Sequence, residues 1–115
     1  MDIVGESVVI RPSSVGAEEF SRAIERRQSA AALTIWILGS GDVSTVLTVK
    51  LQGSNDLDNW SDIGTTSTLS GVPSHHEQDM GYIGGWSFLR LRYVAQNASS
   101  SEALAIRAGI RQYSD

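Results

Sequence analysis

The sequence contains no cysteine, and no stretch of about 18 consecutive apolar residues occurs in it. Without cysteine, disulfides, thiol nucleophiles and thiolate metal sites are excluded, so packing and hydrogen bonds must stabilise the fold. The chain runs from Met1-Asp2 into Glu6, where a secretion leader would place basic and then apolar residues. We therefore expect neither a membrane-spanning segment nor a standard signal peptide.

Basic residues are few: nine Lys and Arg against thirteen Asp and Glu give a formal charge of −4 and a pI near 5.0. Nucleic-acid binding depends on clustered cations, and an anionic lipid surface repels an acidic protein, so we expect neither partner. Lys50 is the single lysine. The predominance of arginine fits oligomer contacts, because guanidinium groups tolerate desolvation at interfaces, and it fits the codon bias of a GC-rich genome equally well.

Sequence motifs of catalysis are also missing. The chain has no G-x-S-x-G elbow, no P-loop and no H-E-x-x-H pair. The glycines between Gly81 and Gly85 lack the strand-turn-helix context of a nucleotide-binding loop. Glu18 and Glu19 are adjacent in sequence, so they do not form an acid/base pair across a cleft. We expect a protein that is not an enzyme and that binds no cofactor.

The sequence does contain the alternation of apolar and polar residues that is typical of half-buried β-strands. Within residues 43–51, one face carries Val43, Thr45, Leu47, Val49 and Leu51. Similar patterns predict strands at residues 8–11, 32–38, 60–63, 80–83, 86–94 and 104–111. The expected fold is all-β, a single domain over residues 1–115 built as an antiparallel β-sandwich or jelly roll of about 7–8 strands.

Turn residues predict how these strands are connected. Gly39-Ser40-Gly41-Asp42 predicts a hairpin between residues 32–38 and 43–52, and the turn at residues 55–59 extends it into a three-strand meander. Residues 86–94 and 104–111 are predicted to form a second hairpin. Residues 64–78 are rich in Thr, Ser and Gly and are predicted to be a long surface crossing.

Residues 17–27 fit two different structures. Phe20, Ile24 and Arg27 lie at helical spacing, with Ser14 as a candidate N-cap, and this favours a short helix. Phe20 and Ile24 also fit the alternation of a strand. Both alternatives remain open from the sequence.

Two motifs carry a resemblance to known β-sandwich families. The first is Leu51-Gln52-Gly53-Ser54-Asn55-Asp56 with Asn59-Trp60, and the second is Phe88-Leu89-Arg90-Leu91-Arg92-Tyr93. In this order they resemble small phage virion proteins, such as head-decoration and tail-associated subunits, and also discoidin-like (coagulation-factor type C) jelly rolls. The chain lacks the discoidin cysteine pair, is shorter than that domain, and has Leu57 where its turn glycine would stand. These departures favour the phage group.

The phage resemblance implies a non-enzymatic structural subunit, located in the virion or in the cytoplasm of the producing cell. Such a subunit acts by homo-oligomerisation or by binding a larger capsid or tail shell. Aromatic and arginine side chains are enriched at protein interfaces. The expected interface residues are therefore Trp36, Trp86, Phe88, Arg90 and Arg92.

The discoidin resemblance implies the alternative function, a carbohydrate-binding module. A sugar-binding site needs an exposed aromatic ring beside hydrogen-bonding side chains. The candidate residues for such a site, at one end of the sandwich, are Trp60, Tyr82, Trp86 and Asp56.

No metal site is expected. Asp56 and Asp58 are weak calcium candidates, because the spacing is not that of an EF-hand and a turn rich in Asp and Asn is explained better by side-chain bonds to the backbone. The adjacent His75 and His76 point to opposite sides of an extended chain, so they do not chelate one ion together.

Overall fold

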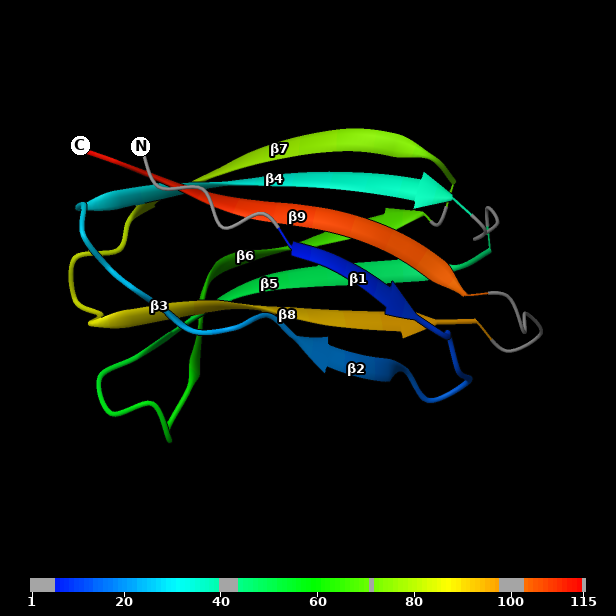
Figure 1. Ribbon diagram of the computed structural model, residues 1–115, viewed down its shortest axis with the longest axis horizontal. Coiled ribbons are helices and arrows are strands. Elements are labelled where there is room, and N and C mark those ends of the chain that lie inside the picture. Colours follow the sequence, from blue (N-terminus) through cyan, green and yellow to red (C-terminus); the bar gives the residue numbers. More distant parts are fainter. Residues whose placement is uncertain (1–5, 40–43, 71, 98–102, 115) are drawn as a thin grey trace.

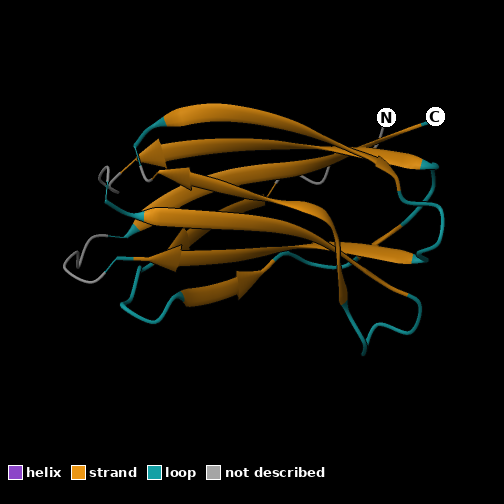
Figure 2. Cartoon of the chain, turned by 180° about the vertical axis from the view of Figure 1, so that it is seen from behind, coloured by secondary structure: helices purple, strands orange, loops and turns teal. Residues whose placement is uncertain are grey.

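The computed structural model describes residues 6–39, 44–70, 72–97 and 103–114, and these ranges contain strands and loops but no helix (Figures 1 and 2). No segment of these ranges is therefore a helix that could span a membrane. The strands are β1 (Glu6–Ile10), β2 (Ala17–Phe20), β3 (Ile24–Glu25), β4 (Ala30–Gly39), β5 (Val46–Ser54), β6 (Ser61–Ser70), β7 (Ser74–Tyr82), β8 (Phe88–Gln96) and β9 (Leu104–Tyr113).

The strands form two antiparallel sheets that pack face to face, which confirms the predicted all-β sandwich. The four-stranded sheet has the order β1-β9-β4-β7. The five-stranded sheet has the order β2-β8-β5-β6, with the short β3 also paired to β8. Figure 1 shows the two layers, with β4 and β9 in one and β5 and β8 in the other.

The chain passes from one sheet to the other at almost every connection, which is the arrangement of a jelly roll. Among the described strands, β5 and β6 are consecutive in sequence and paired with each other. The hairpin predicted between residues 32–38 and 43–52 is wrong, because β4 and β5 belong to different sheets. The predicted hairpin of residues 86–94 and 104–111 is also wrong, because β8 and β9 belong to different sheets. Of the predicted three-strand meander, the structure contains the β5-β6 pair.

The core lies between the central strands of the two sheets. Alternate residues of β4 and β9 face those of β5 and β8, and the largest of these side chains are fully buried. They include Leu33, Ile35, Ile37, Leu47, Val49, Leu51, Leu89, Leu91, Tyr93, Leu104, Ile106 and Ile110. The inward faces predicted from alternation are therefore correct for the described residues, and Val43 lies outside them.

Residues 17–27 form no helix, so that alternative is wrong. β2 pairs with β8 from Ala17↔Ala95 to Phe20↔Arg92, and β3 continues on the same edge at Ile24↔Leu89. An isolated helix of this length is marginal, whereas pairing with β8 satisfies the backbone groups and half-buries Ile24 against the core.

Residues 64–78 are not a surface crossing, since most of them belong to β6 and β7. These are edge strands, one in each sheet. The outward residues of an edge strand contact solvent, and β7 carries polar residues such as His75, Glu77 and Asp79. Polar residues on an edge strand disfavour its pairing with other chains. Because such a strand has few apolar residues, the alternation of apolar and polar residues does not predict it.

The side chain of Trp86, in the β7-β8 loop, packs directly against the backbone of Gly53 in β5. A Cβ atom built on Gly53 would lie 2.4 Å from the indole ring and 2.8 Å from Cδ1 of Ile63. Glycine is required at this position because any larger residue would occupy the space of the ring.

We predict that Gly53→Ala lowers the free energy of unfolding by about 1–3 kcal/mol, the usual effect of overpacking. Urea unfolding followed by tryptophan fluorescence measures this change. Gly85→Ala is the matched control, because a Cβ there meets no atom within 4 Å. Equal stability of the two variants would contradict the packing argument.

Candidate functional site

The five residues predicted as one interface lie in three places. Trp36 lies on the outer face of the four-stranded sheet, because it alternates with buried Ile35 and Ile37. Phe88, Arg90 and Arg92 lie on the outer face of the five-stranded sheet. Trp86 is half-buried and packs against the core. These side chains therefore do not form one continuous surface, and their contact with another molecule stays a prediction.

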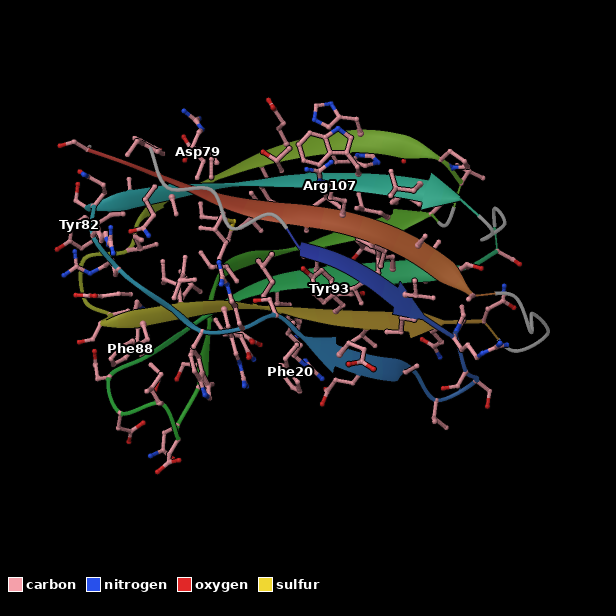
Figure 3. All side chains as sticks on the ribbon, in the orientation of Figure 1. Phe20, Asp79, Tyr82, Phe88, Tyr93 and Arg107 are labelled. Carbon is pink, nitrogen blue, oxygen red and sulfur yellow. The ribbon has the colours of Figure 1, made fainter. Side chains whose placement is uncertain are left out.

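The outer face of the four-stranded sheet carries an aromatic and apolar patch, here called the Trp36 face and comprising Val9, Trp36, Leu38, His75 and Arg107. Trp36 lies between His75 on β7 and Arg107 on β9 in the strand register. Its ring stacks on the imidazole with 5.0 Å between centroids and 20° between planes. Figure 3 labels Arg107 on this sheet and Tyr93 between the layers.

The outer face of the five-stranded sheet has a different chemistry, centred on Arg90 of β8. The guanidinium carbon of Arg90 lies 4.0 Å from the ring centroid of Phe20 and 4.2 Å from that of Trp60. Phe20 is the last residue of β2 and Trp60 the residue before β6, so segments far apart in sequence pack on the same group. Cation-π attraction, which is stronger where water is partly excluded, holds the guanidinium in place.

A row of side-chain hydrogen bonds, running from β8 across β5 to β6, also holds Arg90 in position. Arg90 Nε donates to Gln52 Oε1 at 2.9 Å, and Gln52 Nε2 donates to Asp62 Oδ1 at 2.9 Å. Lys50 Nζ donates to the second oxygen of Asp62 at 3.3 Å. The hydrogen bond from Gln52 and the charge of Lys50 lower the pKa of Asp62, so this carboxylate is ionised at neutral pH.

A second ion pair completes this face. Arg92 Nε donates to Glu18 Oε2 at 2.7 Å, across the β2-β8 pair. Burial lowers the pKa of Arg90, and the Glu18 carboxylate opposes that shift. We name Phe20, Lys50, Gln52, Trp60, Asp62, Arg90 and their ion-paired neighbours Glu18 and Arg92 the Arg90 cluster.

The sequence reasoning selected Arg90, Arg92 and Trp60 but missed Phe20 and Gln52. Gln52 lies two positions from Lys50 on the outward face predicted for β5, so alternation alone identifies its orientation. Phe20 belongs to the segment left open between helix and strand. Its position became definite only when β2 was seen to pair with β8.

The alternative ligand residues share one end of the sandwich. Asn55 of the β5-β6 loop donates to the Gly85 carbonyl at 3.4 Å and accepts from Ser87 N at 2.9 Å, so the two loops touch. Tyr82 is 69% exposed, and Figure 3 labels it at the same end of the sandwich as Phe88. The Trp86 ring, however, packs on Gly53, and the Trp60 ring packs on Arg90.

Asp56 organises the β5-β6 turn. Its Oδ1 accepts from the backbone N of Asp58 at 2.9 Å, from that of Asn59 at 2.8 Å, and from Ser54 Oγ at 3.0 Å. Its Oδ2 accepts from Asn59 Nδ2 at 2.7 Å. Bonds from Asn59 and Asp58 strongly lower the pKa of Asp56.

These contacts give Asp56 the role of a turn residue. In the described part of the chain, no group of three or more His, Asp and Glu is arranged to hold a metal ion. The same turn places Leu57 at φ 67°, a left-handed conformation that glycine adopts more readily. The position where the discoidin pattern has glycine thus has the backbone that glycine favours.

We predict that Asp56→Ala lowers the melting temperature at pH 7 and pH 5 by similar amounts. A carboxylate with a lowered pKa contributes stability above its unfolded pKa, near 3.8, and loses it as the pH falls through the folded value. The difference from the wild type should therefore shrink only below about pH 4. Melting followed by circular dichroism at pH 7, 5 and 3 measures this difference, and Asp58→Ala is the control from the same turn. If the difference between Asp56→Ala and the wild type were already lost at pH 5, the role of the Asp56 carboxylate in the turn would be refuted.

Comparison with known proteins finds a similar fold among solved structures but identifies no family for this sequence. No protein-family model matches the sequence, and no curated protein matches it. The fold is similar to that in the crystal structure of PirA, with a TM-score of 0.62 and 11% sequence identity over 93% of each chain. Neither the phage nor the discoidin group is identified by these matches. At this identity, the chain shares with PirA a β-sandwich fold.

Proposed function

We propose that this protein is a non-enzymatic assembly subunit that associates with copies of itself through the Trp36 face. The observation that carries the proposal is the exposure of large apolar side chains there: Val9 is 68% exposed, Leu38 56% and Trp36 38%. They project from β1 and β4, which flank β9. Contiguous apolar surface of this kind marks protein interaction sites, and the neighbouring Arg107 suits an interface.

The charges on the Trp36 face support a second copy as the occupant. Arg107 on β9 lies opposite Trp36, whereas Glu77 lies on β7 opposite Thr34. The apolar strand β4 is therefore flanked by opposite charges. A two-fold axis through β4 would bring Arg107 of one copy toward Glu77 of the other, as a self-complementary interface requires.

The finer assignment, to a phage capsid-decoration or tail-associated subunit, rests on the resemblance of the motifs at residues 51–60 and 88–93. The jelly-roll arrangement is compatible with it, because viral capsid proteins use this fold, but lectin domains use it as well. The Trp36 face favours assembly over the loop-end sugar site, in which two of the three candidate rings, those of Trp60 and Trp86, are engaged within the protein.

We predict that the wild type has a solution mass that is a discrete multiple of 12.4 kDa and persists on dilution. Leu38→Glu should shift it to the monomer, because burying an unpaired carboxylate in an apolar contact is unfavourable. Light scattering on a size-exclusion column at two concentrations measures both masses.

Val46→Glu is the matched control for this experiment. Val46 is 42% exposed and lies on β5, on the outer face of the other sheet, so its replacement should leave the mass unchanged. A monomeric wild type at both concentrations would reject self-association. Dissociation by Val46→Glu but not by Leu38→Glu would reject the Trp36 face as the interface.

A further inference from the structure

The Arg90 cluster holds a guanidinium with free donors. The structure gives Arg90 one hydrogen bond, from Nε to Gln52, and within the described residues its Nη1 and Nη2 atoms have none. The other two cations of the cluster are engaged, since Lys50 pairs with Asp62 and Arg92 with Glu18. A planar group with two unused nitrogen donors is suited to bidentate binding of an oxyanion.

We infer that Arg90 is the anchor of a binding site for a carboxylated sugar, such as a uronic acid residue of a glycan. The rings of Phe20 and Trp60 fix the plane of the guanidinium, and Gln52 fixes its rotation, so little side-chain entropy is lost when a ligand binds. The two Nη groups would donate to the two oxygens of the sugar carboxylate.

The charges around Arg90 select a carboxylate over a phosphate. Asp62 lies one residue away through Gln52, and Glu18 lies beside Arg92 on the neighbouring strand. Each of these acids shares its charge with a paired cation, which leaves the cluster with one net positive charge. A monoanion balances that single charge, whereas a phosphate dianion would leave an uncompensated negative charge on this face.

The neighbouring groups suit a sugar ring. A pyranose presents hydroxyl groups, which need both donors and acceptors, and C–H groups, which pack on aromatic rings. Lys50 has ammonium donors beyond its bond to Asp62, the Asp62 oxygens can each accept a further hydrogen bond, and Phe20 is 40% exposed beside Arg90. These contacts come from the flat face of the sheet, so no deep pocket is required.

The position of Arg90 disfavours an acidic peptide. A peptide strand commonly docks by adding to the free edge of a sheet, where backbone groups lack partners. Arg90 lies on β8, between β5 and the β2 edge segment, where the backbone is already paired. This site and the Trp36 face lie on opposite outer faces, so the inference does not depend on self-association.

The test uses a matched pair of probes, trigalacturonic acid and neutral galactotriose, titrated into the full chain by calorimetry. We expect binding of the acidic probe and at least about tenfold weaker binding of the neutral one, as for the loss of a charge-assisted hydrogen bond. Arg90→Lys keeps the charge but removes the fork, and should weaken binding by about tenfold or more.

Arg111→Gln is the control variant, because Arg111 lies over one ring, that of Tyr113, on the other sheet. It should bind the acidic probe like the wild type. Equal affinity for both probes, or equal loss in the two variants, would overturn the inference. So would binding of a Glu-rich peptide more tightly than of the acidic sugar, or the absence of binding to any probe.

A measurement on the wild type alone tests the site even if the Arg90 variant does not fold. The indole N–H of Trp60 donates to the Leu57 carbonyl at 3.1 Å, so its NMR resonance reports on the cluster. The acidic probe should shift this resonance and leave that of Trp36, on the opposite face, in place. Shifts confined to Trp36 or Trp86 would reject the site.

Discussion

The apolar layer between the two sheets holds the other features of this protein in place. Alternate side chains of β4, β5, β8 and β9 are withdrawn from water, and burial of large aliphatic groups contributes about 1.5–3 kcal/mol for each. Because a strand presents its residues alternately to opposite sides, burial of one face forces the intervening residues outward. The orientation of Trp36 and Arg90 follows from the burial of Ile35, Leu89 and Leu91.

The two outer faces then have different chemistry on the same framework. On the four-stranded sheet, apolar groups and the stacked Trp36 and His75 rings lie exposed, a surface suited to protein contact. On the five-stranded sheet, cross-strand bonds join Arg90 to Gln52, Gln52 and Lys50 to Asp62, and Arg92 to Glu18, and the guanidinium of Arg90 packs on the rings of Phe20 and Trp60. The first face exposes apolar groups, and the second holds a hydrogen-bond donor in a fixed position.

The loops at one end of the sandwich are maintained by their own polar contacts. Asp56 accepts four hydrogen bonds within its turn, and Asn55 ties this turn to the β7-β8 loop. A side chain occupied in this way is a poor ligand for calcium or sugar, because binding would first break those bonds.

Much of the fold was predictable from local pattern, because alternation depends only on which residues avoid water. It identified the inward residues Leu47, Leu91 and Ile106, and the outward residues Trp36 and Arg90. It predicted strands at residues 60–63 and 80–83, which overlap only one end of β6 and one end of β7, and it missed the rest of these two strands because their residues are mostly polar. It also left residues 17–27 undecided, since a short amphipathic segment takes the structure that its neighbours allow.

The sequence by itself determined the β class, the buried face of each central strand and the turn chemistry at residues 55–59. Only the tertiary structure decided which strands are partners, because a hairpin turn and a crossing between sheets use the same residue types. It alone brought Phe20, Gln52, Trp60 and Arg90 together from four segments. Contacts between distant segments depend on sheet order, and sheet order is set by the packing of the whole core.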